Sequence, residues 1–176
     1  MPRVIVTGAP GVGKTSLLAE LARRGFHTVA ESARAVIAER LAQGLMPRPD
    51  PLSFALEIYR RDRQSYLGCP PEPASVFFDR CAIESLGMVH EAAPFSDKAL
   101  QAELSCFAFH RTVYLLPPWE AIYRTDPERD HTFEHALRVH DSLLRWYGRL
   151  GYGIEEVPRL PVPQRAQHLL MALGLG

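Results

Sequence analysis

A glycine-rich segment near the N-terminus has the residue types and spacing of a phosphate-binding loop. It reads Gly8-Ala9-Pro10-Gly11-Val12-Gly13-Lys14-Thr15, with Ser16 next. Glycines let the backbone curl so that successive N–H groups point at one anion, and a helix that starts there adds positive charge. In this pattern Lys14 reaches the β- and γ-phosphates, and the Thr15 hydroxyl ligates Mg²⁺. The segment therefore predicts a site for a nucleoside triphosphate, expected to be ATP, together with Mg²⁺.

Two charged residues, Asp79 and Arg80, directly follow the mostly apolar run 75–78. We interpret this run as a strand buried on both faces, which would place both side chains at its tip. Asp79 is predicted to hold Mg²⁺ or one of its water ligands, and the alternative is the N-cap of the next helix. Arg80 is a candidate for binding an acceptor oxygen or a phosphate, and the alternative is an ion pair with a nearby Glu.

A third candidate, Glu31, follows the short strand-like stretch 27–30. From that position its carboxylate would project toward the γ-phosphate, where it could accept the proton of an attacking hydroxyl. The alternative is a solvated carboxylate at the start of the next helix, where the helix dipole favours negative charge.

A group of arginines around Asp62 is interpreted as a charged solvent face of the helix 51–67, in preference to the lining of an anion pocket; it contains Arg60, Arg61 and Arg63.

The elements that must position these residues alternate along the chain. Strands are expected at 4–7, 27–30, 75–78, 113–116 and 152–157. Helices are expected at 14–24, 32–44, 51–67, 81–91, 97–107, 131–147 and 163–173, with Ser32 and Asp50 as N-caps. Because parallel strands need crossover helices, this order predicts an α/β, three-layer fold with a parallel sheet of about five strands and helices on both faces. Ligands of such sheets bind at the carboxyl ends of the strands, which is where the candidates lie.

Composition narrows the class of protein. The 176 residues include 20 basic and 20 acidic side chains, so the formal net charge is zero, which argues against an electrostatically driven nucleic-acid binder. No apolar run approaches the roughly 20 residues of a membrane-spanning helix, and the start of the chain leaves no room for a signal peptide. Cys69, Cys81 and Cys106 are widely spaced and odd in number, as expected for reduced thiols. We expect a single cytoplasmic domain over residues 1–176, without nucleic-acid or membrane partners.

Missing residues exclude two classes of phosphate-loop protein. Guanine-specific GTPases read their base with an Asn/Thr-Lys-x-Asp sequence, but the chain contains no Asn, and neither Lys14 nor Lys98 is followed by x-Asp. No Asp is followed by Gly at the third place, so the GTPase Asp-x-x-Gly motif is absent as well. Ring-forming ATPase motors carry Asp-Glu after the third strand, whereas this chain has Asp79-Arg80. Base recognition in this fold often uses backbone atoms, so GTP stays an alternative to ATP.

Together these segments resemble those of the P-loop nucleoside and nucleotide kinases. In particular, the chain is similar to a group of small predicted ATPases, an AAA-domain group related to the ribosylnicotinamide kinase domain of bacterial NAD-metabolism proteins. Four segments carry this resemblance beyond the loop itself: Glu31-Ser32-Ala33-Arg34, Phe77-Phe78-Asp79-Arg80, Tyr123-Arg124-Thr125-Asp126-Pro127-Glu128-Arg129, and 151–163. The resemblance implies a lid near 119–130, in which Arg124 and Arg129 close over the γ-phosphate, and a loop at 151–163 that passes over the adenine. For each of these arginines, simple solvent exposure is the alternative.

The function that this resemblance implies is transfer of the ATP γ-phosphoryl group to a hydroxyl of a small molecule. Lys14, Glu31, Arg80, Arg124 and Arg129 would act on the reacting groups, and the loop 8–16 would hold the nucleotide. Two alternatives stay open at this point. One is a regulatory ATPase that uses the same pocket as a switch and has no small acceptor. The other is a scaffold protein that holds a nucleotide without turnover.

Overall fold

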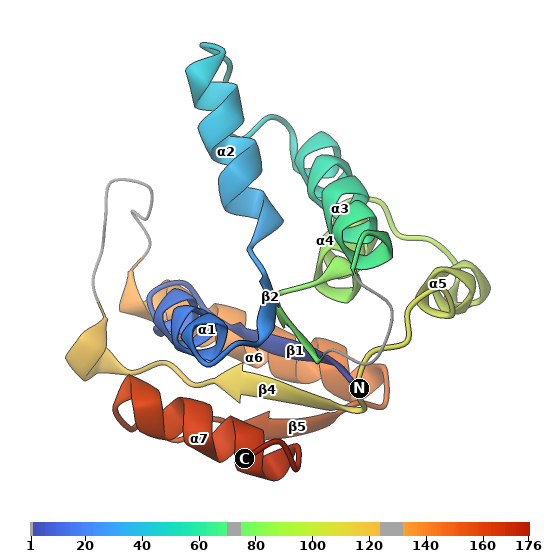
Figure 1. Ribbon diagram of the computed structural model, residues 1–176. Helices are drawn as coiled ribbons and strands as arrows, with labels where there is room; N and C mark the ends of the chain where they lie inside the picture. The colour runs from blue at the N-terminus through green and yellow to red at the C-terminus, as the bar shows by residue number, and fades with distance from the viewer. Residues whose placement is uncertain (1, 70–74, 124–131) are drawn as a thin grey trace.

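Five parallel strands form one sheet in the described part of the chain (Figure 1). The computed structural model describes residues 2–69, 75–123 and 132–176. The strands are β1 (Arg3–Gly8), β2 (His27–Val29), β3 (Val76–Asp79), β4 (Thr112–Leu116) and β5 (Gly153–Glu156). Their spatial order is β2-β3-β1-β4-β5, so every strand-to-strand connection crosses over through helices. The predicted fold class, a parallel sheet of about five strands, is confirmed.

The register of the central strands brings separate sequence segments to one edge of the sheet. Strand β1 lies in the middle, and its Val6 is opposite Asp79 at the end of β3. On its other side, Gly8 at the end of β1 is opposite Leu116 at the end of β4. The glycine-rich loop that leaves β1 and the charged residues that leave β3 therefore lie side by side at the carboxyl edge of the sheet.

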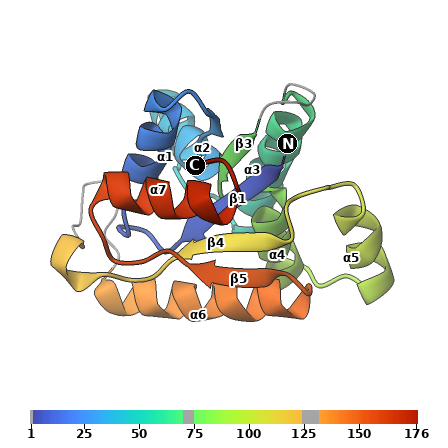
Figure 2. The same ribbon diagram turned by 60° about the horizontal axis from the view of Figure 1, so that its bottom comes forward.

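Helices cover both faces of this sheet. They are α1 (Lys14–Arg23), α2 (Ser32–Ala42), α3 (Pro51–Leu67), α4 (Ala82–Ala92), α5 (Asp97–Leu104), α6 (Phe133–Arg149) and α7 (Val162–Ala172), with one 3₁₀ turn η1 (Glu120–Ile122). Figure 2 shows α6 on one side of β4 and β5, with α1 and α7 on the other. Helix α3 packs against α4, and α2 extends away from the sheet (Figure 1). Of the helices in the described ranges, none is both long and apolar enough to cross a membrane.

The apolar side chains of the strands alternate between two buried clusters. On β1, Val4 and Val6 pack with Leu17 and Leu21 of α1, whereas Ile5 belongs to the cluster on the opposite face. That second cluster includes residues of α4 and α6: Ile83, Leu143 and Tyr147. Because both faces of the central strands β1, β3 and β4 are buried, these strands read as mostly apolar runs in the sequence.

The predicted helix starts at Lys14, Pro51 and Asp97 are confirmed, and the starts of α4, α6 and α7 differ from the predicted ones by one or two residues. The Asp50 side chain caps α3 by accepting a hydrogen bond from the backbone N–H of Ser53 at 3.0 Å, as predicted. The expectation that Ser32 caps α2 is wrong, because Glu31 occupies the N-cap and Ser32 is the first helical residue. Helix α6 begins at Phe133, two residues later than predicted, because the Thr132 hydroxyl caps it. Such shifts leave the positions of the candidate residues at the strand ends unchanged.

Candidate active site

The backbone of the glycine-rich loop adopts conformations that only glycine tolerates well. Gly8 has φ 149°, and a Cβ atom there would lie 2.6 Å from the carbonyl oxygen of Leu116 on the neighbouring strand. Gly13 has φ 87° in the left-handed region and is the N-cap of α1. A side chain at either position would therefore be strained. The sequence pattern thus corresponds to a loop that turns sharply from β1 into the N-terminus of α1, the geometry that suits anion binding.

Lys14 lies beneath this loop in a buried position. Its ammonium donates hydrogen bonds to the carbonyl oxygens of Gly8 and Ala9, each at 2.9 Å. Burial, together with the positive charge of Arg80, lowers the pKa of Lys14 to about 8. The next two residues, Thr15 and Ser16, are exposed in the first turn of α1. A buried cation next to exposed hydroxyls is the chemistry that a phosphate chain with a bound divalent cation requires.

Asp79 ends strand β3 beside this loop and is 7% exposed. Its Oδ1 atom is buried without a hydrogen-bond partner among the described residues. Burial raises the pKa of Asp79 to about 6, since a charged carboxylate is poorly solvated there. The capping alternative does not hold, because the N-cap of α4 is Cys81. An orphaned carboxylate oxygen at a strand tip fits a group that completes the coordination of Mg²⁺, which is commonly held by one or two carboxylates plus phosphates.

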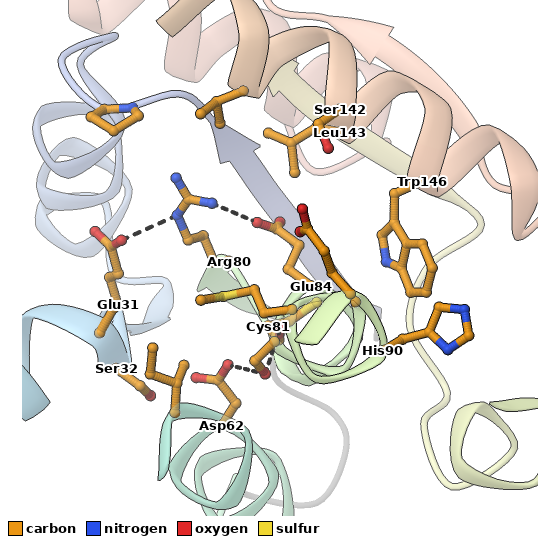
Figure 3. Close-up of a pocket in the computed structure, with 18 of the residues that line it drawn as sticks. Glu31, Ser32, Asp62, Arg80, Cys81, Glu84, His90, Ser142, Leu143 and Trp146 are labelled. Carbon is orange, nitrogen blue, oxygen red and sulfur yellow. Dashed lines mark hydrogen bonds and ion pairs between the residues drawn. The ribbon is translucent and has the colours of Figure 1, made fainter. Parts of the chain in front are cut away.

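Arg80 connects three elements around the loop. Among the described residues it is the one non-glycine residue with a positive φ, 63°. Its Nη1 donates to Glu84 at 2.8 Å, its Nη2 donates to the carbonyl oxygen of Gly8 at 3.0 Å, and its Nε lies 3.1 Å from Glu31 (Figure 3). Burial opposes the charged form, but the carboxylates of Glu84, Glu31 and Asp79 outweigh it and raise the pKa of Arg80. The ion pair with a nearby Glu, foreseen as an alternative, is therefore present, and it involves two glutamates.

Glu31, at the N-cap of α2, has both carboxylate oxygens engaged. One lies 3.1 Å from Arg80 Nε, and the other accepts a hydrogen bond from Arg34 Nε at 3.2 Å. Burial alone would raise the pKa of Glu31, but the nearby positive charges of Arg80, Lys14 and Arg34 outweigh it and lower this pKa. A carboxylate with a lowered pKa is a weak proton acceptor. The role of Glu31 as a base stays a prediction, and its ion pairs favour an orienting role.

A cavity of about 580 Å³ adjoins the phosphate loop. Pro10 of the loop, Glu31 and Arg80 line it, and the start of α2 with helices α3, α4 and α6 contributes the rest of the wall. Helices α4 and α6 are held together beside this cavity, since Trp146 Nε1 donates to the carbonyl oxygen of Ile83 at 3.0 Å. Figure 3 shows Arg80 and Glu84 between the Glu31 side of the cavity and its Trp146 side.

Asp62 also lines this cavity, in contrast to its predicted place on a solvent face of α3. Its Oδ2 accepts a hydrogen bond from the Ser85 hydroxyl at 2.7 Å, and burial raises the pKa of Asp62 to about 6. The helical spacing could have shown this orientation, because Asp62 lies four and seven residues after the buried Ile58 and Ala55, on the same helix face. The neighbouring arginines do not line the cavity: Arg60 and Arg63 are exposed, and Arg61 donates to Glu39 at 2.8 Å.

Arg165 is a second residue that the sequence reasoning missed. It projects from α7, is 5% exposed, and donates from Nη1 to the carbonyl oxygen of Val12 in the phosphate loop at 3.3 Å. Its guanidinium lies 5.9 Å from the centre of the Trp119 ring. No local signal in the sequence marks this residue, because its partner is 153 positions away. The two predicted lid arginines, Arg124 and Arg129, lie outside the described residues.

Comparisons with known proteins agree with this geometry. A family described as AAA domain matches residues 3–165. This chain belongs to that family. The match confirms the resemblance to the AAA-domain group of P-loop proteins that the sequence motifs indicate. A comparison with curated proteins finds no match.

Solved structures share the fold at low sequence identity. A deoxyadenosine kinase from M. mycoides with bound dATP is 11% identical with a TM-score of 0.59, over 99% of this chain and 100% of that one. A thymidylate kinase from Ehrlichia chaffeensis is 12% identical with a TM-score of 0.58, over 99% and 100% of the two chains. NadR protein in complex with NR is 16% identical with a TM-score of 0.64, over 98% of this chain and 50% of that one. At these identities the likeness establishes the P-loop kinase fold, which is the one that the sequence predicts.

Proposed function

We propose that this chain binds ATP with Mg²⁺ and transfers the γ-phosphoryl group to a hydroxyl of a small molecule. The observation that carries the proposal is the position of the cavity, which is lined by Pro10 of the phosphate loop itself. A molecule in that cavity would lie next to the end of the triphosphate. The fold shared with nucleoside and nucleotide kinases supports the proposal.

The phosphate loop positions the donor in this proposal. Backbone N–H groups of the loop 8–16 and the ammonium of Lys14 neutralise the β- and γ-phosphates, since that ammonium lies within the loop. Thr15 and Asp79 are the residues that would hold Mg²⁺, and their hydroxyl and carboxylate are oxygen ligands of the kind that this cation prefers. When bound, the cation would neutralise charge on the phosphate oxygens. Arg165 contributes further positive charge behind Val12.

The cavity positions the acceptor. Its hydroxyl oxygen forms a bond to the γ-phosphorus while the bond from that phosphorus to the β-γ bridging oxygen breaks, and ADP leaves. Glu31 accepts a hydrogen bond from the attacking hydroxyl and orients it, while its lowered pKa makes it a poor final site for the proton. The proton then passes to the phosphate product or to water, consistent with a reaction driven by positioning and electrostatics. Arg124 and Arg129 are proposed to close over the transferred group.

An acceptor screen tests this proposal. The protein is incubated with Mg·ATP and pools of small hydroxyl compounds, and mass spectrometry detects a gain of one phosphoryl group. The expected result is a phosphorylated product whose formation requires Lys14. The chain offers a matched control, because Lys98, on α5, is the one other lysine and is exposed. The variant Lys14→Ala should lose the product and Lys98→Ala should keep it. ATP turnover without any phosphorylated product, stimulated instead by a protein, would favour the regulatory ATPase.

A further inference from the structure

We infer that the acceptor is an unphosphorylated molecule, neutral or cationic, with hydroxyl groups at one end and a flat ring at the other. The inference rests on the proposed function and concerns the same cavity. Among the residues that the structure describes, four carboxylates line this cavity, from Glu31, Asp62, Glu84 and Glu91, and two guanidinium groups do, from Arg80 and Arg149. The wall described here is therefore acidic.

Both arginines of the wall already have a carboxylate partner. All three guanidinium nitrogens of Arg80 contact a carboxylate or a carbonyl oxygen, through Glu31, Glu84 and Gly8. Arg149 donates to Asp97 on α5 at 2.8 Å. An anionic acceptor that takes Arg80 as its cationic partner would have to break one of these ion pairs, whereas Arg149 contacts Asp97 through Nη2 alone. Such an exchange leaves a carboxylate without its partner, which is costly for Glu84 because its side chain is only 5% exposed.

The histidines of the cavity do not reverse this balance. His90 accepts a hydrogen bond at Nδ1 from the backbone N–H of Phe95 at 3.3 Å, so this nitrogen does not donate to an acceptor in this arrangement. His135 lies at the α6 side of the cavity and carries a positive charge only when it is protonated. A phosphate monoester brings a charge of about −1.5 to −2 at pH 7, which the surrounding carboxylates repel.

Hydroxyl groups have suitable partners on the α3 side of the cavity. Asp62 accepts a hydrogen bond from the Ser85 hydroxyl at 2.7 Å and is also hydrogen-bonded to the Ser32 side chain. A carboxylate offers about four lone-pair positions, so Asp62 keeps acceptor capacity for hydroxyl groups of a ligand. All three side chains line the same wall. Sugar-like or polyol hydroxyls match this cluster.

A flat apolar surface forms the other end of the cavity. Trp146 packs directly on α4 at Gly87, where a Cβ atom would lie only 2.8 Å from Cε2 of the indole. The His90 ring is inclined by 33° to that indole with the centres 6.2 Å apart, and Figure 3 shows both side chains at this end. Met88 and Leu143 also line the cavity. An aromatic or heterocyclic ring in an acceptor would contact these groups over its face.

Matched acceptor pairs test the inference. A panel of nucleosides and other ring-bearing polyols is compared with the corresponding phosphate monoesters at equal concentration, and phosphoryl transfer from ATP is followed by mass spectrometry and ADP release. We expect kcat/KM for unphosphorylated acceptors to exceed that for their monoesters by at least about tenfold. A monoester used as well as or better than its parent compound overturns the inference and leaves the proposed function intact. If neither member of any pair gains a phosphoryl group, the proposed function fails and the inference fails with it.

Variants of the wall provide a second readout. Glu91→Arg adds a cation at an exposed position of the cavity rim and should narrow the preference against monoesters several-fold. Asp62→Asn should raise KM for hydroxyl-rich acceptors more than it lowers kcat, since it weakens hydroxyl binding. Asp141→Asn removes an exposed carboxylate of α6 that does not line the cavity, and is the matched control. If none of the cavity variants changes the preference for unphosphorylated acceptors, this preference does not come from the wall described. The same conclusion holds if Asp141→Asn changes the preference equally.

Discussion

The phosphate loop and the acceptor cavity adjoin each other but are specified in opposite ways. The loop is one contiguous segment, 8–16, whose glycines and backbone contacts fix its shape. The cavity is assembled from the loop, the start of α2, and helices α3, α4 and α6, which are far apart in the sequence. In the loop the backbone provides most of the chemistry, whereas in the cavity it comes from ion-paired side chains.

This difference separates the general part of the site from the specific part. A loop built from backbone N–H groups and one lysine recognises any triphosphate, because it contacts only groups that all of them share. The cavity instead depends on the salt-bridge network of Arg80, Glu31 and Glu84, in which only Arg80 also donates a hydrogen bond to the loop, at the carbonyl oxygen of Gly8. Variants that affect one region and spare the other would therefore establish the division of roles.

The largest expected effect comes from the loop, in Lys14→Ala. Loss of the buried ammonium should reduce ATP turnover by about 100-fold or more, because charge on the transferred phosphoryl group is no longer neutralised. Calorimetry and ADP release measure binding and turnover, and thermal unfolding confirms the fold. Lys98→Ala should match the parent. Unchanged ATP affinity and turnover in Lys14→Ala would contradict the phosphate-loop assignment.

The pH dependence of triphosphate binding by the parent protein also tests the role of the Lys14 charge. The pKa of Lys14 is lowered to about 8 in the free protein, so the ammonium loses its charge as the pH rises through that value. Triphosphate binding favours the charged form and should weaken by up to about fivefold between pH 8 and pH 9. Lys14→Ala should lack this dependence, and binding that is independent of pH in the parent would show that the charge of Lys14 is not used.

The next effect concerns the cavity, in Arg80→Ala. This change leaves Glu84 and Glu31 without their shared guanidinium partner and should lower the free energy of unfolding by about 3 kcal/mol. Arg80→Gly should be about 1 kcal/mol less destabilised than Arg80→Ala, because position 80 has φ 63°. Urea denaturation followed by circular dichroism measures both. If both variants match the parent, the network does not contribute to stability.

Much of the fold could be predicted because the relevant signals are local. Apolar runs such as 75–78 predict buried strands, and the residues after them lie at the ligand-binding edge because parallel strands share that edge. Asp50 followed by Pro51 marked the start of α3. Helix starts at Ser32 and His131 were misplaced by one or two residues, because neighbouring residues compete for the cap and only tertiary contacts decide between them.

The site was predictable only where its chemistry is contiguous. Sequence motifs indicated the loop 8–16 and Asp79 as candidates, whereas Asp62 was assigned to solvent because three arginines surround it in the sequence. Its inward orientation follows from the helical spacing to Ile58, an indication that charge patterning obscured. Arg165 could not have been found, since its contact with Val12 joins residues 153 positions apart.

The smallest expected effect lies where the two regions meet, at Asp79. Burial raises the pKa of this carboxyl to about 6, above the unfolded value of 3.8, so keeping it ionised at pH 7 reduces stability. Asp79→Asn should therefore be more stable than the parent at pH 7 by about 1 kcal/mol, after the cost of an unpaired amide. The advantage should disappear between pH 6 and pH 4, where the folded parent takes up the proton.

In thermal unfolding with Mg·ATP, the variant should need about tenfold more Mg²⁺ than the parent for the same stabilisation, because a carboxylate charge is lost. A variant that is less stable at pH 7 and responds to Mg²⁺ like the parent would make Asp79 a structural residue of β3, and the chemistry of the metal would then rest on the phosphate loop alone.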